Sequence, residues 1–443
     1  MDTILILGAG KSSVYLIDYL LETAKTKNRK IVVGDVSLEI ASQKLKGHQF
    51  GEAVVIDLDD VENRKSLIKR SDVVISMLPA FLHPIIGKDC LELGKHFFSA
   101  SYESDEMRKM EAQIKSKNLL FLNECGLDPG LDHMSAMKII HQEKDSGNTI
   151  TSFKSFTGGV LAPESEDNPW KYKFTWNPRN VVLAGQGVSR FILHGNYKYV
   201  PYHMLFRRLE KVSFEDVGDF DGYPNRDSLG YRKIYGLNEI PTLIRGTLRR
   251  AGFCQSWDVF VQLGITDDSF KMELPEGFSH RMFFNSFLPY KESLTVEEKL
   301  QELLPWVDSE ILSKIEWLGL FSDLPLPKTN GSPAAILEQI LKGKWKLQDH
   351  DKDMIVMQHL FEIATPKSKK KIVSSLVCKG ENQEYTAMAK TVGLPLAIAV
   401  DLFLEDKFNV RGLHVPVLPE IYEPILEALV RQGIEFNEET MPA

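Results

Sequence analysis

The chain has 443 residues, and this length predicts two or three domains rather than one core. Its net charge of −8 disfavours nucleic acid as a partner, and no apolar run approaches the roughly 20 residues that span a bilayer. Four cysteines without metal-like spacing predict reduced thiols in a cytoplasmic protein that has no metal site.

The first predicted element is a strand at residues 3–7, which begins too early to leave room for a signal peptide. It ends in a glycine turn, and a helix pattern follows from Val14. The first glycine permits the tight bend, and the second lets the backbone approach a pyrophosphate at the helix N-terminus. Ser13 occupies the third glycine position, and its small side chain can still pack helix against strand. We therefore predict dinucleotide contacts from Gly8, Gly10, Lys11, Ser12 and Ser13.

A second strand is predicted at residues 30–34, and it ends in Asp35. In dinucleotide-binding βαβ units, an acidic residue about 20 positions after the glycine turn binds the adenosine ribose. The alternative is an ordinary strand-to-helix turn and a solvated aspartate. Because both features lie in one βαβ unit, we favour dinucleotide binding.

Three more strands are predicted at residues 53–56, 72–76 and 96–99, and a helix at residues 85–93 separates the last two. Strands that alternate with helices at this spacing predict an α/β fold with a parallel, doubly wound sheet of the Rossmann type. Residues that follow the carboxyl ends of such strands are candidate ligand contacts. For the cofactor they are Asp57, which could instead only cap a turn, and Ser76, Met77 and Leu78.

An apolar run at residues 119–122 predicts a buried strand, and an Asp-Pro-Gly break then leads into a helix that begins near Leu131. A carboxylate at the carboxyl end of a strand in an open α/β sheet points into the crevice where ligands bind. Asp128 is therefore a candidate site residue.

The rest of the chain predicts an α+β substrate domain with a mixed sheet and a small helical subdomain. The strand-like segments are residues 150–156, 181–183, 353–359 and 371–377. A helical pattern covers residues 294–341, and a last helix at residues 386–404 is expected to pack on the first domain. The predicted limits are 1–128 with 386–443 for the dinucleotide-binding domain, 129–290 with 347–385 for the substrate domain, and 291–346 for the helical subdomain.

Seven longer motifs give the chain a resemblance to a known family. They are residues 123–133, 158–164, 167–169, 172–176, 223–228, 245–249 and 317–323. On these motifs the sequence resembles the L-glutamate-forming saccharopine dehydrogenases, also called saccharopine reductases, along nearly its whole length. That family interconverts saccharopine with L-glutamate and 2-aminoadipate 6-semialdehyde, using a nicotinamide cofactor. The resemblance implies an NAD(P)-dependent oxidoreductase of lysine metabolism that acts on small molecules.

Saccharopine carries three carboxylates, so an acidic protein needs fixed cations to bind it. Arg226 and Arg249 match the family's substrate-binding arginines, and a planar guanidinium can bind a carboxylate through two parallel bonds. Thr247 and the backbone of Leu248 match the same substrate-binding turn. The structural alternative for Arg226 is a salt bridge within its own turn.

The resemblance also implies contacts in the reaction centre. Ser101 and Tyr102, after the fifth strand, match a pair that contacts both substrate and cofactor. Asp128 matches a residue that contacts both ligands, and Trp176 is expected to cover the nicotinamide. Asp128 and Tyr102 are the candidates for accepting protons during the reaction. His133 is a weaker candidate because it would lie one turn into a helix, and bound water or a substrate carboxylate could take this role instead.

The chain departs from the family at two positions. Thr157 stands where some members carry a cysteine, so that thiol cannot assist the chemistry here. Asp35 stands near a position where fungal members that use the 2′-phosphorylated cofactor carry an arginine. A carboxylate would repel a 2′-phosphate, so we expect NAD to be preferred over NADP.

Other functions remain open at this stage. A carboxynorspermidine-type or lysine-forming saccharopine dehydrogenase would share the scaffold, although the former acts on substrates with fewer carboxylates, which Arg226 and Arg249 disfavour. A non-catalytic dinucleotide-binding sensor is a rival from another class. A homodimer through the second domain is expected from the family, with no membrane and no nucleic acid partner.

Overall fold

The computed structural model describes residues 1–442, which fold into two compact units. The first unit contains Met1–Ile150, Ala364–Lys369 and Leu376–Glu439. The second contains Thr151–Ile363 and Lys370–Ser375, and the chain enters it again from Thr440. These limits differ from the predicted ones, because residues 129–150 belong to the first unit and the helices of the predicted subdomain belong to the second.

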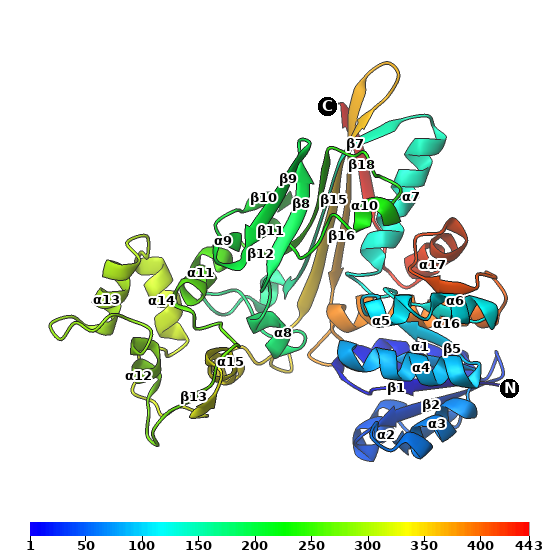
Figure 1. Cartoon of the computed structure of the whole chain (residues 1–443), viewed down its shortest axis with the longest axis horizontal. Coiled ribbons are helices and arrows are strands. Elements are labelled where there is room, and N and C mark those ends of the chain that lie inside the picture. Colours follow the sequence, from blue (N-terminus) through cyan, green and yellow to red (C-terminus); the bar gives the residue numbers. More distant parts are fainter. Residues whose placement is uncertain (443) are drawn as a thin grey trace. The chain divides into compact units, whose positions relative to one another are not determined.

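The first unit contains a parallel seven-stranded sheet in the order β17-β6-β5-β4-β1-β2-β3, which confirms the predicted doubly wound fold. Figure 1 labels β1, β2 and β5 of this sheet. The order reverses between β1 and β4, and a sheet of this kind binds ligands at the carboxyl ends of its strands beside that reversal. The strands are β1 (Asp2–Leu7), β2 (Arg29–Asp35), β3 (Gly51–Val55), β4 (Val73–Ser76), β5 (His96–Ser99), β6 (Leu120–Leu122) and β17 (Gly412–His414).

Helices cover both faces of this sheet. On one face, Val74 and Phe97 pack in a buried cluster with Ile86 of α4. On the other face, Phe98 of β5 contacts Phe403 of α16, with ring centroids 5.5 Å apart. The helices are α1 (Val14–Ala24), α2 (Leu38–Leu45), α3 (Val61–Lys69), α4 (His83–Leu93), α5 (Asp105–Arg108), α6 (Glu111–Ser116), α7 (Leu131–Asp145), α16 (Ala387–Leu404) and α17 (Pro419–Arg431).

A buried carboxylate fastens α16 to the sheet. Asp401 is 2% exposed and accepts hydrogen bonds from the guanidinium of Arg29, from Lys27 Nζ at 2.6 Å and from the Tyr19 hydroxyl at 3.1 Å. By length and composition α16 alone among the helices of residues 1–442 could span a membrane, but 72% of it is buried in the protein. Its burial and its contacts with α1 are those of a core helix, as predicted.

Most of a nine-stranded mixed sheet belongs to the second unit, as predicted. Its main order is β10-β11-β12-β7-β15-β16-β18, with β8 and β9 branching from β12, and the β12–β7 pair is parallel. The strands are β7 (Thr149–Leu161), β8 (Val188–Leu193), β9 (Asn196–Pro201), β10 (Glu210–Phe214), β11 (Gly218–Pro224), β12 (Thr242–Arg250), β15 (Asp353–Ala364), β16 (Lys369–Lys379) and β18 (Asn437–Pro442), with a separate pair β13 (Met272–Glu273) and β14 (Asn330–Gly331).

Apart from α10, the helices of the second unit share one hydrophobic cluster with this sheet. The helices of the unit are α8 (Pro178–Val182), α9 (Tyr202–Leu205), α10 (Tyr231–Ile234), α11 (Phe253–Leu263), α12 (His280–Asn285), α13 (Val296–Leu303), α14 (Ser309–Trp317) and α15 (Pro333–Lys344). The prediction of a strand at residues 181–183 was wrong. Asn177 caps α8 by accepting from Arg179 N at 2.9 Å, and Pro178 at the first helical position favours the helix.

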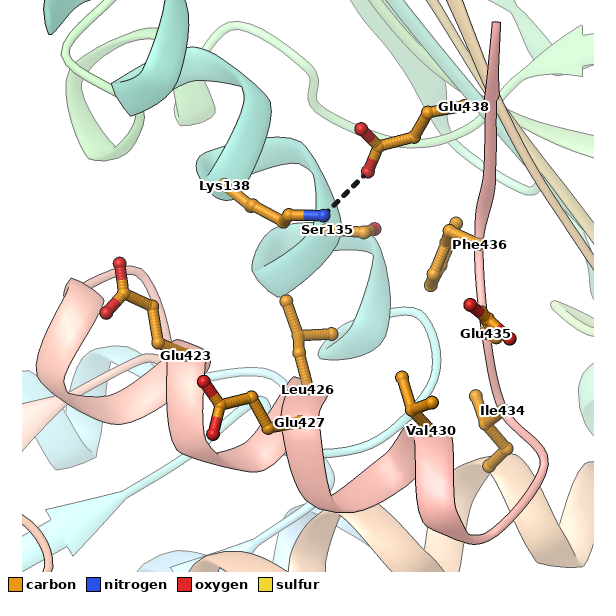
Figure 2. Close-up of a pocket in the computed structure, with 10 residues that line it drawn as sticks. All are labelled: Ser135, Lys138, Glu423, Leu426, Glu427, Val430, Ile434, Glu435, Phe436 and Glu438. Carbon is orange, nitrogen blue, oxygen red and sulfur yellow. Dashed lines mark hydrogen bonds and ion pairs between the residues drawn. The ribbon is translucent and has the colours of Figure 1, made fainter.

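The last segment of the first unit runs beside α7 and α17 (Figure 2). Lys138 of α7 pairs with Glu438 at 3.0 Å, and a pocket of about 370 Å³ lies between the three segments. Its walls include Leu426, Val430 and Phe436. No predicted site residue lines this pocket. Contacts of this kind explain why α7 belongs to the first unit.

We expect Asp401→Ala to lower the free energy of unfolding by about 3–5 kcal/mol, because Arg29 would be left buried without its carboxylate. Urea denaturation followed by fluorescence measures this change. As a control, Glu384→Ala removes an exposed ion pair with Lys44 and should cost less than about 1 kcal/mol. Equal losses of unfolding free energy in the two variants would contradict the stabilising role of the buried Asp401–Arg29 pair.

Candidate active site

The two glycines of the turn in the first unit have different surroundings. Gly8 is closely packed, whereas the space around Gly10 is open. Gly8 has a φ of +100°, and a Cβ there would lie 3.0 Å from the carbonyl oxygen of Met77. Gly10 has an extended backbone, and no atom outside Gly10 and its two chain neighbours lies within 4 Å of an added Cβ. Ser13 is buried and donates to the Gly10 carbonyl at 2.8 Å. The turn therefore leaves open the space that a pyrophosphate needs, and Ser13 fits the third position as predicted.

Asp35 contacts the same turn from the end of β2. One carboxylate oxygen accepts from Ala9 N at 2.8 Å, and the other accepts from Ser37 N at 3.1 Å. The carboxylate thus holds the turn in place and puts a negative charge beside it. Val36 is 78% exposed next to this charge, an apolar surface that the sequence analysis did not single out.

Three other predicted cofactor residues lie in different parts of the structure. Asp57 is exposed and accepts from Asp59 N at 2.9 Å, so it caps a turn, which was the alternative given for it. Lys11 is also exposed, next to Gly10. Trp176 belongs to the second unit, where it is partly buried against the hydrophobic cluster. A cofactor contact of these residues stays a prediction.

Three hydrogen-bonded side chains lie at the ends of β4 and β5, and one of them, His83, was not predicted as a site residue. His83 contacts the hydroxyl of Ser76 through Nδ1 at 2.8 Å and the hydroxyl of Ser101 through Nε2 at 2.7 Å. Burial lowers the pKa of His83 to about 4, so its ring is neutral near pH 7. Only the Ser76 and Ser101 members were predicted. A histidine beside Pro84 at a helix start was the available signal.

The segment after β6 brings two predicted catalytic side chains together. The Tyr102 hydroxyl donates to Asp128 Oδ1 at 3.3 Å, and both residues are half-buried. Gly130 has a φ of +148°, and a Cβ there would lie 2.2 Å from Gly126 N. The loop therefore folds tightly on itself and holds Asp128 beside Tyr102.

His133 has the structural surroundings that the sequence predicted. It is fully buried in α7, with Nε2 2.9 Å from Glu124 Oε2 and Nδ1 3.5 Å from Asp132 Oδ2. The other oxygen of Glu124 accepts from Glu103 N at 3.0 Å. His133 thus anchors the chain on both sides of the Tyr102–Asp128 pair and is itself inaccessible.

The second unit contains a buried cation without a carboxylate partner. Arg249 is 4% exposed, and its guanidinium carbon lies 5.6 Å from the ring centroid of Tyr172, 6.0 Å from that of Tyr223 and 5.8 Å from that of Phe253. It donates to the Leu248 carbonyl at 3.0 Å, and within residues 1–442 no carboxylate forms an ion pair with it. Because a guanidinium stays charged, this is an unusual and costly state.

The remaining substrate-site candidates lie on or beside β12. Thr247 and Arg249 alternate with Leu248, so they point to the same face of the strand. Leu248 is buried and packs closely against Gly158. A Cβ added at Gly158 would lie only 2.8 Å from Leu248. Arg226 is exposed just beyond β11 with a φ of +47°, and β11 pairs with β12. The two candidate guanidinium groups, Arg249 buried and Arg226 exposed, thus lie near the same pair of strands.

Two family models match the chain. The saccharopine dehydrogenase NADP binding domain matches residues 4–122, and the saccharopine dehydrogenase C-terminal domain matches residues 126–434. A solved structure of apo histidine-tagged saccharopine dehydrogenase (L-Glu forming) from Saccharomyces cerevisiae matches with a TM-score of 0.92 and 31% identity, over 100% of both chains.

Curated relatives agree with these matches. The chain is 33% identical to saccharopine dehydrogenase (NADP⁺, L-glutamate-forming) of Saccharomyces cerevisiae, over 99% of each chain. It is 34% identical to the mitochondrial alpha-aminoadipic semialdehyde synthase of Rattus norvegicus, over 98% of this chain and 47% of that protein. The chain therefore spans about half the length of the first curated relatives it matches, and nearly all of the fungal ones.

Substitutions at the two glycines should separate folding from dinucleotide binding. We expect Gly8→Ala to destabilise the protein by about 1–3 kcal/mol, because of its positive φ and the Met77 carbonyl. Gly10→Ala should leave stability unchanged but weaken NADH binding at least about tenfold, since the methyl would occupy the space of the pyrophosphate. Thermal denaturation and fluorescence titration with NADH measure the two effects. Unchanged NADH affinity in Gly10→Ala would contradict the assignment of the turn.

Proposed function

The chain belongs to the saccharopine dehydrogenase family, and from this premise we propose that it interconverts saccharopine with L-glutamate and 2-aminoadipate 6-semialdehyde, using a nicotinamide dinucleotide. The observation that carries the proposal is the buried guanidinium of Arg249 without a carboxylate partner. Saccharopine offers three carboxylates, and a desolvated guanidinium–carboxylate bond is strong and geometrically specific.

The chemistry sets the task of the side chains. The C–H bond on the lysyl carbon next to the secondary amine breaks, its electron pair leaves as hydride, and a C=N bond remains. Water then adds to that carbon, and the bond between that carbon and the nitrogen breaks, so that the aldehyde forms and the nitrogen leaves as the amino group of L-glutamate. When bound, the nicotinamide ring accepts the hydride. The protein must orient the reacting carbon, hold the carboxylates and accept protons from the amine and from water.

The residues divide these tasks by location. We assign carboxylate binding to Arg249 and Arg226, with Thr247 and the Leu248 backbone completing the substrate contacts. Asp128 and Tyr102 are assigned to proton transfer, since the Tyr102 hydroxyl already donates to the Asp128 carboxylate. Asp128 is the acceptor because a half-buried carboxylate can take a proton and Tyr102 can then orient it.

The dinucleotide contacts are assigned to the first unit. Its open space at Gly10 fits a pyrophosphate, with Lys11, Ser12 and Ser13 at the following helix start. We assign Ser76, Met77, Leu78 and Ser101 to the nicotinamide half, and Trp176 of the second unit to covering the ring. Asp57 is assigned to the adenine side. The four cysteines are buried and form no disulfide within residues 1–442, which supports a reducing, cytoplasmic location; a homodimer stays a prediction.

We expect purified protein to form reduced cofactor from saccharopine and NAD⁺, with L-glutamate and the semialdehyde as products. Arg249→Met should raise KM for saccharopine at least about 100-fold, because a buried charged contact is lost while the side-chain length is kept. Arg250→Met is the matched control, since this neighbouring buried arginine is already paired with Glu166 at 2.5 Å. It should change stability but not KM.

Coupled spectrophotometric and chromatographic assays in both directions give these values. Absence of reduced cofactor with either NAD⁺ or NADP⁺ would reject the proposed function. A normal KM for saccharopine in Arg249→Met would reject only the role of Arg249.

We further propose that the chain prefers NAD(H), although the matching family model and the fungal relatives are named for NADP. The support is the Asp35 carboxylate, which is followed by the uncharged residues Val36 and Ser37. A 2′-phosphate beside Asp35 would meet a negative charge and no cation from these neighbours, whereas a ribose 2′-hydroxyl can donate to the carboxylate.

The ratio of kcat/KM for NADH to that for NADPH should exceed about tenfold in the wild-type protein, because of charge repulsion at Asp35. Asp35→Asn removes the charge but keeps an oxygen that can accept from Ala9 N. It should therefore lower this ratio toward one without unfolding the turn. A wild-type preference for NADPH would contradict the assignment.

A further inference from the structure

His83 lies between the ends of two parallel strands, at the first position of α4. Its side chain is 4% exposed and joins Ser76, which ends β4, to Ser101, just beyond β5. Ser99 Oγ lies 3.4 Å from the same ring nitrogen that contacts Ser101. The imidazole therefore bridges the two strand ends that border the proposed nicotinamide half of the site.

The backbone of Ser101 is fixed from both sides. Its N–H donates to Ser99 Oγ at 3.1 Å, and its carbonyl accepts from Glu124 N at 3.0 Å. With the backbone held, the remaining freedom of Ser101 is the direction of its hydroxyl group. The His83 contact at 2.7 Å restricts that freedom.

The protonation state of the His83 ring determines which partner donates and which accepts in its hydrogen bonds with the two serines. Burial lowers the pKa of His83 to about 4, so one nitrogen carries a hydrogen and the other carries a lone pair near pH 7. One serine hydroxyl must then accept from the ring while the other donates to it. In either tautomer the Ser101 hydroxyl is fixed as the donor or as the acceptor of its hydrogen bond with His83. The other hydrogen bonds that this hydroxyl can form then point away from the ring.

We propose that His83 is a positioning residue that orients the Ser101 hydroxyl toward the bound dinucleotide and substrate. The proposal rests on the proposed function, because it takes Ser101 as a ligand contact. His83 itself is buried and acts through Ser101, so it needs no contact with either ligand.

Two amide substitutions distinguish this role from simple packing. The amide group of glutamine reaches about as far as Nε2 of histidine, whereas that of asparagine reaches about as far as Nδ1. His83→Gln can therefore keep the contact with Ser101, and His83→Asn can keep only the contact with Ser76. A histidine that merely fills space would not separate the two variants.

We expect His83→Asn to weaken NADH binding and to lower kcat/KM for saccharopine, each about tenfold, because a hydrogen bond to a ligand-binding hydroxyl is lost. His83→Gln should stay within about threefold of the wild type. In a Ser101→Ala background, His83→Asn should have no further effect on either quantity, because the group through which it acts is gone.

His96 of β5 provides a matched control, because it is also a histidine with a partly buried ring. Burial also lowers its pKa to about 4, and its Nδ1 accepts from Leu120 N at 3.0 Å, but it lies at the start of β5 rather than at its end. His96→Asn should lower stability and leave NADH affinity and kcat/KM unchanged. Thermal denaturation checks the folded fraction, and His83→Phe replaces His83→Asn if the latter does not fold.

Equal effects of His83→Gln and His83→Asn, or additive effects of His83→Asn and Ser101→Ala, would overturn the proposal. If the wild-type protein does not turn over saccharopine, the proposed function fails, and the coupling measured in NADH affinity alone still decides the role of His83. If turnover is normal and no coupling is found, only the role of His83 fails.

Discussion

The close approach between the glycine turn and the end of β4 is the constraint on which the first unit's site depends. Gly8 leaves no room for a side chain because the Met77 carbonyl lies against it, and the Asp35 carboxylate holds Ala9 N from the neighbouring strand. Three strand ends are thereby fixed at the reversal of strand order, where a doubly wound sheet binds ligands. The open space at Gly10 follows from this rigidity, because a turn free to relax would fill it.

The same kind of constraint continues toward the proposed reaction centre. A main-chain hydrogen bond joins Ser101 to Glu124, and the side chain of Glu124 contacts His133 in turn. Tyr102 and Asp128 lie on the two segments that these contacts join. In this segment the supporting residues Glu124 and His133 are buried, whereas Tyr102 and Asp128 are half-buried. Such a division keeps hydroxyl and carboxylate groups in fixed directions before any ligand arrives.

The sequence predicted the features that local patterns determine. Apolar runs, glycine punctuation and the Asp-Pro-Gly break located the strand ends of the first unit, and hence Asp35 and Asp128. It could not predict His83, whose role arises only where strands distant in sequence converge. Residues 181–183 were misread because the β-branched pair outweighed the Asn177-Pro178 helix start. The compact first unit extends beyond the predicted limit at residue 128 because α7 packs on α17, a contact that no local pattern reveals.

Arg249 gives the second unit an energetic property that extends beyond recognition. A charge held among aromatic rings without a counter-ion makes the ligand-free protein less stable than its packing alone would allow. A carboxylate that fills the site removes this strain, so ligand affinity and the stability of the surrounding core are linked quantities. Natural variation that relaxed the core around β12 would then also change substrate affinity, even where no ligand contact was altered.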